Sequence, residues 1–200
     1  MTKSSSNTIR IIHGKEIELH LEALAELRIE IFREFPYLYD GSFEYEKNYL
    51  KTYVNSPESI AVLVFDGDRM VGASTGLPME DEIDEFKAPF LQNGYHPDRI
   101  FYCGESILKH NYRGQGIYSA FMNNRENHAK QIGRFDTICF CGVVRPNNHP
   151  LRPDDYHPLD PIWTKFGYQK YPELTTYYHW KDLDEKTESA KKMVFWLKPL

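Results

Sequence analysis

The stretch KHNYRGQGIYSAF, residues 109–121, constrains the fold of this 200-residue chain more than any other segment. It places Gly114 and Gly116 directly after Arg113, between a strand-like segment and one with helical spacing. Glycine lets a backbone turn sharply and approach a ligand without a Cβ atom in the way. The first turn of a helix also presents unpartnered N–H groups at the positive end of its dipole. The stretch therefore predicts a strand–loop–helix junction that binds a phosphate-bearing ligand.

Two other interpretations of this loop are a plain tight turn and a dinucleotide site. Gly114-x-Gly116-x-x-Ser119 almost fits the dinucleotide fingerprint, and Asp136 lies about the right distance downstream for a ribose contact. However, Asp136 opens the following strand, whereas a ribose-binding acid belongs at the carboxyl end of that strand. The strand–loop–helix segment also lies deep in the chain and does not open a strand–helix–strand unit, as a dinucleotide site does. We therefore disfavour a dinucleotide, and the plain turn stays open.

The pattern along the chain predicts one α/β domain over residues 1–200, with a polar, disordered tail at 1–8. Apolar spacing of three and four predicts a helix over 15–35, and Ser42 caps a second helix that buries Tyr45, Tyr49 and Tyr53. Residues 79–94 resemble a surface loop carrying a short helix. Strands are expected at 8–12, 59–65, 69–77, 99–109, 136–144, 168–180 and 191–200, and further helices at 117–132 and 162–166.

Composition excludes several classes of function. The net charge is −5 and the isoelectric point is near 5.9, so no basic field attracts nucleic acid or an anionic membrane. The longest apolar run, residues 60–65, is too short to cross a bilayer, and the N-terminus lacks the apolar core of a secretion signal. Three cysteines favour reduced thiols over a disulfide framework. We expect a cytoplasmic protein.

Two motifs resemble a known family. ESILKHNYRGQGIYSAF resembles the core motif of the GCN5-related N-acetyltransferases, Arg/Gln-x-x-Gly-x-Gly/Ala, and WTKFGY at 163–168 resembles their YEKLGF. The order of predicted elements is also similar. The resemblance implies an α/β fold with a mixed, mostly antiparallel sheet of six to seven strands flanked by about four helices. Two positions depart from the motifs: Tyr118 replaces a small residue, and Trp163 replaces a tyrosine.

The resemblance also implies a cofactor and the residues that bind it. The glycine loop would hold the diphosphate of acetyl-coenzyme A, with Arg113 as a charged fork. The preceding strand would pair its backbone with the pantetheine arm as if the arm were another strand. The implied cofactor-binding residues are Ser106, Ile107, Leu108, Arg113, Gly114, Gln115, Gly116, Ile117, Tyr118 and Ser119.

Acetyl transfer to an amine requires a group that removes a proton, because an alkyl amine with a pKa of about 10.4 is mostly protonated at neutral pH. The family places a glutamate on the strand before the glycine loop, where this chain has Glu105 in an apolar setting. A surface or ion-paired role for Glu105 stays open. Many relatives use a tyrosine as the acid at the position of Trp163, which has no acidic proton. We nominate Tyr156 for that role, with Tyr168 as an alternative.

We expect a primary amine of a small molecule or peptide as acceptor. The acidic segment 80–85 would attract a cationic acceptor or serve only as solvated surface. The proline-rich segment 145–161 would form a stiff wall or lid over the acyl end of the cofactor. No metal is expected, because Cys139, Cys141, His149 and His157 lack the spacing of a zinc site. The alternative function is a non-catalytic acyl-coenzyme A sensor. Whether residues 191–200 pair within their own sheet or with a second chain in a homodimer stays open.

Overall fold

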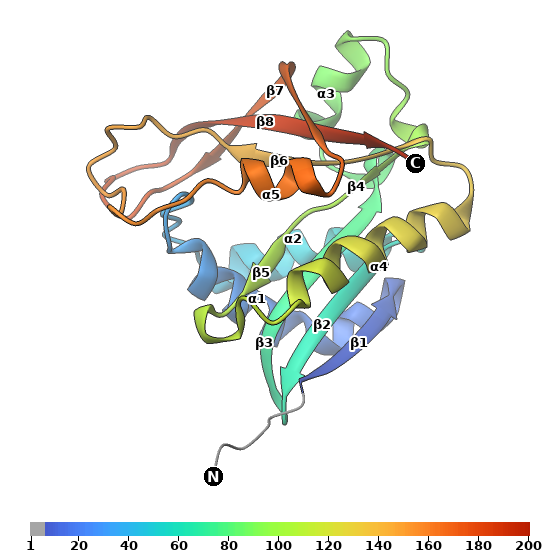
Figure 1. Cartoon of the computed structure of the whole chain (residues 1–200), viewed down its shortest axis with the longest axis horizontal. Coiled ribbons are helices and arrows are strands. Elements are labelled where there is room, and N and C mark those ends of the chain that lie inside the picture. The colour runs from blue at the N-terminus through green and yellow to red at the C-terminus, as the bar shows by residue number, and fades with distance from the viewer. Residues whose placement is uncertain (1–6) are drawn as a thin grey trace.

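Residues 7–200, described by a computed structural model, form one mixed sheet with helices on both faces (Figure 1). Its strands run in the order β1-β2-β3-β4-β6-β8-β7, and β5 joins the sheet through β3. The β4–β6 pair is parallel, and the other pairs in this part of the chain are antiparallel. The predicted mixed, mostly antiparallel sheet is confirmed.

The bounds of the elements follow. The strands are β1 (Thr8–His13), β2 (Ile60–Asp66), β3 (Arg69–Pro78), β4 (Ile100–Tyr102), β5 (Ser106–Leu108), β6 (Thr137–Val143), β7 (Gln169–Trp180) and β8 (Ser189–Pro199). The α-helices are α1 (Leu21–Phe32), α2 (Phe43–Asn55), α3 (Asp84–Gln92), α4 (Ile117–Ile132) and α5 (Asp160–Lys165). Short 3-10 helices are η1 (Gly14–His20), η2 (Met79–Asp81), η3 (Pro97–Arg99) and η4 (His110–Tyr112).

Two hydrophobic clusters hold the layers together. The first packs α1, α2 and α3 on one face of the sheet, and the second packs α4 and α5 on the other. Side chains of β6 alternate between them, with Cys139 and Cys141 in the first cluster and Phe140 in the second. All three cysteines are free and buried, as expected. Within residues 7–200, no helix is both long enough and apolar enough to cross a bilayer.

The helices that precede β2 differ in detail from the predictions. The first begins as the 3-10 turn η1, and α1 ends at Phe32 rather than Phe35. The Ser42 cap is confirmed, since its hydroxyl accepts a hydrogen bond from the backbone N–H of Tyr45 at 3.3 Å. Tyr45 itself is 44% exposed, because the buried stripe of α2 contains Glu46 instead. The expected tail is shorter than 1–8 because Thr8 belongs to β1, and residues 1–6 lie outside the described residues.

The last strand pairs within its own sheet. β8 lies between β6 and β7 and pairs with both of them over most of its length. Both of its edges are therefore used inside this chain, which answers the question that the sequence left open. A second chain cannot add to β8 without displacing one of these strands.

The strand expected over 99–109 is broken into β4 and β5 at Cys103–Glu105. Gly104 is required at this break because a Cβ atom there would lie 1.8 Å from the Tyr53 hydroxyl, which reaches in from α2. Arg125 of α4 braces the other side by donating to the carbonyl oxygen of Glu105 at 2.8 Å. β4 consequently stays with β6, whereas β5 pairs with β3 alone. The break raises the strand count above the six to seven that were expected.

Replacing Gly104 with alanine is expected to destabilise the fold by about 1–3 kcal/mol, the usual cost of overpacking a buried site. Chemical denaturation of G104A measures the loss. The double variant G104A/Y53F should recover part of it relative to Y53F alone, because the nearest clashing atom is the Tyr53 hydroxyl. An equal loss in both backgrounds would contradict this account of the break.

Candidate active site

A split opens in the sheet between β5 and the second half of β6 (Figure 1). β4 holds β6 at Thr137–Cys139, and from Phe140 onward β6 pairs only with β8. On its inner edge β5 pairs with β3 at Gly72–Ser74, and among residues 7–200 no strand pairs with its outer edge. Backbone groups on such an edge are free to bind an extended ligand as an added strand.

The glycine loop lies at the end of β5 and has the geometry of an anion site. Gly114 and Gly116 have φ angles of 77° and 80°, the left-handed region that favours glycine, and a Cβ atom on either would meet nothing within 4 Å. Gly116 caps α4 without a side-chain hydrogen bond. Residues 113–116 are exposed. The first N–H groups of α4 therefore face open space at the positive end of the helix.

The side chains around this loop are held by local contacts. Arg113 donates to the Leu108 carbonyl oxygen at 3.2 Å and pairs with Glu34 at 2.8 Å, so a diphosphate would share or displace Glu34. Gln115 binds the Asn111 carbonyl oxygen and accepts from Asn7. A hollow of about 330 Å³ lies beside the loop, and its lining residues are Asn7, Ile9, Gln115, Gly116, Ile117 and Ala120. A larger hollow, about 460 Å³, lies between α1 and α2 and has no residue in common with the loop.

Glu105 lies at the break, buried at the head of the split. One carboxylate oxygen, Oε2, pairs with Arg28 of α1, and the other, Oε1, has no hydrogen-bond partner among residues 7–200. Arg28 also pairs with Glu46 of α2. Both glutamate side chains are 1% exposed. The ion-paired role left open by the sequence is therefore present, and one oxygen is still available to accept a proton.

A second carboxylate, Glu82, is buried near the same cluster. It is 3% exposed, accepts from the backbone N–H of Ile83 at 3.0 Å, and lies 3.5 Å from the Tyr49 hydroxyl. Burial raises the pKa of Glu82 from 4.5 to about 7, and the neighbouring Glu105 adds to the rise. Two glutamates thus pair with Arg28, and Glu82 lies beside Tyr49, whose ring the Arg28 guanidinium covers at 4.7 Å. A carboxylate that titrates near neutrality in such a place is a candidate for proton transfer.

Comparisons with known proteins agree with this geometry. No known sequence family matches the chain, and no curated protein is detectably similar in sequence. Solved structures do match. Arabidopsis thaliana NAA60 in complex with acetyl-CoA superposes with a TM-score of 0.62 at 14% identity, covering 98% of this chain and 99% of that one. A GNAT-family acetyltransferase from Streptococcus pneumoniae gives 0.59 at 13%, covering 98% and 100%. This chain has the fold of the GNAT acetyltransferases.

An N-acetyltransferase from Staphylococcus aureus Mu50 has the same fold, with a TM-score of 0.61 at 13% identity over 98% of this chain and 99% of that one. These likenesses confirm the fold that the two motifs implied. At such identities they extend to the fold alone, so the roles of individual residues rest on the geometry of this chain.

The two positions that depart from the GNAT motifs contact each other. The indole N–H of Trp163 donates to the Tyr118 hydroxyl at 2.8 Å, which joins α5 to α4. Trp163 also lies over Gly142 of β6, where a Cβ atom would approach its ring to 3.1 Å. Burial raises the pKa of Tyr118. The two large residues therefore pack together on the α4–α5 side of the split, where each satisfies the polar group of the other.

The two tyrosines considered for the acid have different surroundings. Tyr168 is 2% exposed and packs against Phe140 at 4.8 Å, inside the second hydrophobic cluster. Tyr156 is half-buried, and its ring packs edge-on against Phe35 at 4.6 Å. Burial raises the pKa of Tyr156. Within residues 7–200, no hydrogen bond joins its hydroxyl to Glu105 or Trp163, so the acid role of Tyr156 stays a prediction.

The acidic segment is less solvated than expected. Glu80 pairs with Arg134 at 2.6 Å, Asp81 accepts from Ser56 at 2.5 Å, and Asp84 pairs with Lys87 at 3.0 Å. Glu82 is turned into the protein, which corrects the expectation of a surface loop. The other acids of the segment stay exposed while forming these contacts, and an attractive field for a cationic acceptor stays a prediction.

Three residues of this region were missed by the sequence analysis: Arg28, Glu46 and Arg125. The signal for Arg28 was available, since it lies four residues after Leu24 and three before Ile31, on the apolar face of α1. A charge at a buried helical position is uncommon unless it is paired. Within the described part of the chain, no group of three or more His, Cys, Asp or Glu residues is placed to hold a metal ion.

Proposed function

We propose that this protein is an acetyl-coenzyme A-dependent N-acetyltransferase that acts on a primary amine of a small molecule or peptide. The observation that carries the proposal is the free outer edge of β5, which leads into the glycine loop and the start of α4. No capping side chain binds the N–H groups at that start, because the N-cap residue is Gly116. A strand edge followed by an anion site fits a ligand that has an extended arm joined to a diphosphate.

The fit to acetyl-coenzyme A follows from these two parts. The diphosphate would bind the N–H groups at the start of α4, beside Gly114 and Gly116. The amide groups of the pantetheine arm would pair with Ser106, Ile107 and Leu108. Ile107 and Leu108 bury their side chains on opposite faces of the sheet, so their backbone groups are what they offer to a ligand. NAA60, which has the same fold, was crystallised with acetyl-CoA and with a bisubstrate analogue.

Glu105 is proposed as the general base. Its Oε2 is held by Arg28, which fixes the carboxylate. Its Oε1 has no hydrogen-bond partner within residues 7–200 and can accept the amine proton directly or through a water molecule. The backbone of Glu105 is fixed as well, by Arg125 and by the backbone N–H of Thr75. Such preorganisation holds the base in one geometry during transfer.

The proposal is tested by following thiol release from acetyl-coenzyme A, with and without a panel of primary amines that includes polyamines, aryl-alkyl amines and short peptides. We expect at least one amine to accelerate thiol release above the rate of hydrolysis and to yield an acetylated product detectable by mass spectrometry. Binding of acetyl-coenzyme A without any amine-dependent release would favour the non-catalytic sensor instead.

A further inference from the structure

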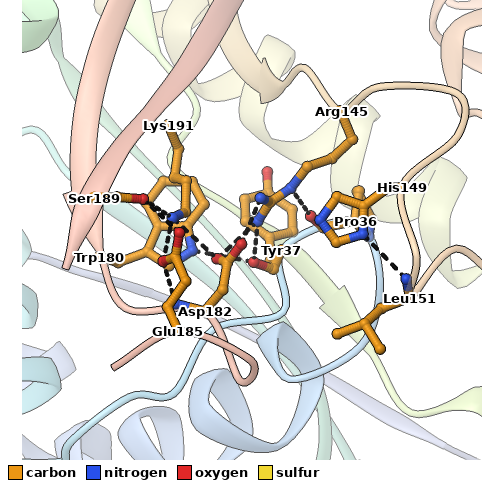
Figure 2. Close-up of polar contacts among 10 residues, drawn as sticks. All are labelled: Pro36, Tyr37, Arg145, His149, Leu151, Trp180, Asp182, Glu185, Ser189 and Lys191. Carbon is orange, nitrogen blue, oxygen red and sulfur yellow. Dashed lines mark hydrogen bonds and ion pairs between the residues drawn. The ribbon is translucent and has the colours of Figure 1, made fainter. Parts of the chain in front are cut away.

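The segment between α1 and α2 is fixed by a buried arginine from the proline-rich segment (Figure 2). Arg145 donates to the carbonyl oxygens of Pro36 and Tyr37, each at 2.6 Å. The same guanidinium binds both carboxylate oxygens of Asp182, at 2.6 and 2.9 Å. The Arg145 and Asp182 side chains are 8% and 3% exposed. Two of these four bonds hold the backbone at Pro36 and Tyr37, and the two to Asp182 hold the planar guanidinium in place.

The β7–β8 end of the sheet completes the attachment. The indole N–H of Trp180 donates to the same Tyr37 carbonyl oxygen at 3.0 Å, so that oxygen accepts two hydrogen bonds. The ammonium group of Lys191 lies 3.5 Å from the buried carboxylate of Asp182, whose charge it partly neutralises, and 2.6 Å from the carboxylate of Glu185. We call Arg145, Trp180, Asp182 and Lys191 the clamp. The clamp fixes the backbone of Tyr37, from which its side chain extends.

Tyr37 lies between the two arms of the split. Arg145 follows the end of β6 by two residues, which places the Tyr37 backbone at the open end of the β6 arm. The Tyr37 ring packs against Phe32 at 4.6 Å, and the Arg28 guanidinium lies over that same Phe32 ring at 5.0 Å. Arg28 pairs with Glu105 at the start of the β5 arm. Tyr37 is therefore connected to both arms, to the β6 arm through Arg145 and to the β5 arm through Phe32 and Arg28.

The Tyr37 hydroxyl is an uncommitted donor. No hydrogen bond within residues 7–200 engages it, and Figure 2 draws none to it. Burial raises the pKa of Tyr37 well above its ordinary value, with smaller contributions from Cys141, Arg28, Tyr118 and Tyr156. The hydroxyl therefore stays protonated at neutral pH and keeps its proton available for a hydrogen bond.

We propose that the Tyr37 hydroxyl donates a hydrogen bond to the sulfur of coenzyme A as the acyl group leaves, and that the clamp positions it for this role. The inference rests on the proposed function. The amine nitrogen forms a bond to the acyl carbon, the carbon–sulfur bond breaks, and its electron pair goes to sulfur. Glu105 takes the amine proton, and Tyr37 keeps its own while stabilising the thiolate. Trp163 is not free for this task, since its N–H is bonded to Tyr118.

The test needs no acceptor. Binding of coenzyme A and of desulfo-coenzyme A, in which hydrogen replaces the thiol, is compared by calorimetry at pH 9, above the thiol pKa of about 8.5. The wild-type protein is expected to prefer coenzyme A by about tenfold, the factor for one hydrogen bond to a charged group. Y37F should lose this preference. Y39F, from the same loop, should keep it.

The clamp is tested in the same way through Arg145→Lys, which keeps a charge but cannot make four bonds. R145K should lose most of the preference for the thiolate, and R145K/Y37F should lose no more than Y37F alone. A preference that survives in Y37F overturns the proposal, and one that survives in R145K overturns the positioning role of the clamp. If the wild-type protein binds neither ligand, the proposed function itself fails.

Discussion

Replacing Glu105 with glutamine is expected to lower the rate of amine acetylation by about 10²–10⁴-fold, the range for loss of a general base. Glutamine keeps an oxygen for Arg28 but cannot take a proton. Affinity for acetyl-coenzyme A should change little, because the cofactor is assigned to the β5 edge and the glycine loop. The difference in rate between E105Q and the wild-type protein should become smaller at high pH, because the amine then loses its proton to solvent. Thiol release measured between pH 7 and 10 checks both points.

The matched control for E105Q is Glu46→Gln. Glu46 pairs with the same Arg28 and is equally buried, but it lies on α2 away from the break. E46Q also removes one negative charge next to Arg28, and its rate of amine acetylation should fall far less than that of E105Q. Equal rates in E105Q and the wild-type protein would contradict the base assignment. Glu82, with a pKa of about 7, would then be the next candidate.

Glu82 is expected to make the stability of the folded protein fall as pH rises. Its pKa is about 7 in the folded protein and 4.5 when solvated, so the folded state binds the extra proton between these values. The protonated form contributes stability that is fully present below pH 4.5 and is lost as pH rises through 7. A rise from 4.5 to about 7 corresponds to about 3 kcal/mol.

Denaturation of the wild-type protein and E82Q from pH 4 to 8 measures this effect. The stability of the wild-type protein relative to E82Q should fall by about 3 kcal/mol across that range, because glutamine stays neutral throughout. Asp84→Asn is the control, since Asp84 belongs to the same acidic run but its side chain is 97% exposed. A difference in stability between the wild-type protein and E82Q that does not change with pH would show that folding does not raise the pKa of Glu82.

Local patterns in the sequence predicted the elements well. The Ser42 cap, the strands β2 and β3, and the junction of the glycine loop and α4 each depend on residues close together in the chain. The geometry of the glycine loop was also predictable, because the left-handed conformation at Gly114 and Gly116 is a local property of the backbone. The resemblance to GNAT acetyltransferases rested on the same local motifs, and the fold confirmed it.

The rest depended on contacts between distant segments. The strand over 99–109 reads as continuous, and it breaks because Tyr53, from α2, occupies the space beside Gly104. Tyrosine spacing predicted that α2 buries Tyr45, Tyr49 and Tyr53. Tyr53 is buried, but Tyr45 is 44% exposed, and Glu46 takes the buried position next to it and pairs with Arg28. No local pattern indicates such pairings, because their partners are fixed only by the folded sheet.

The measurement that tests the central claim most directly is a calorimetric titration with acetyl-coenzyme A of the wild-type protein, Gly116→Ala and Gly94→Ala, with NADH as the control ligand. Gly94 and Gly116 have φ angles of 77° and 80°, and a Cβ atom on either meets nothing within 4 Å, so both variants carry the same backbone strain. Gly94 follows α3, outside the proposed cofactor site.

The account predicts that the wild-type protein binds acetyl-coenzyme A and not NADH, that G116A weakens binding by about tenfold or more, and that G94A leaves it unchanged. Tenfold corresponds to the loss of about one charge-assisted hydrogen bond at the start of α4. Absence of binding, or equal affinities in G116A and G94A, would mean that the loop is a plain turn and would contradict the proposed function.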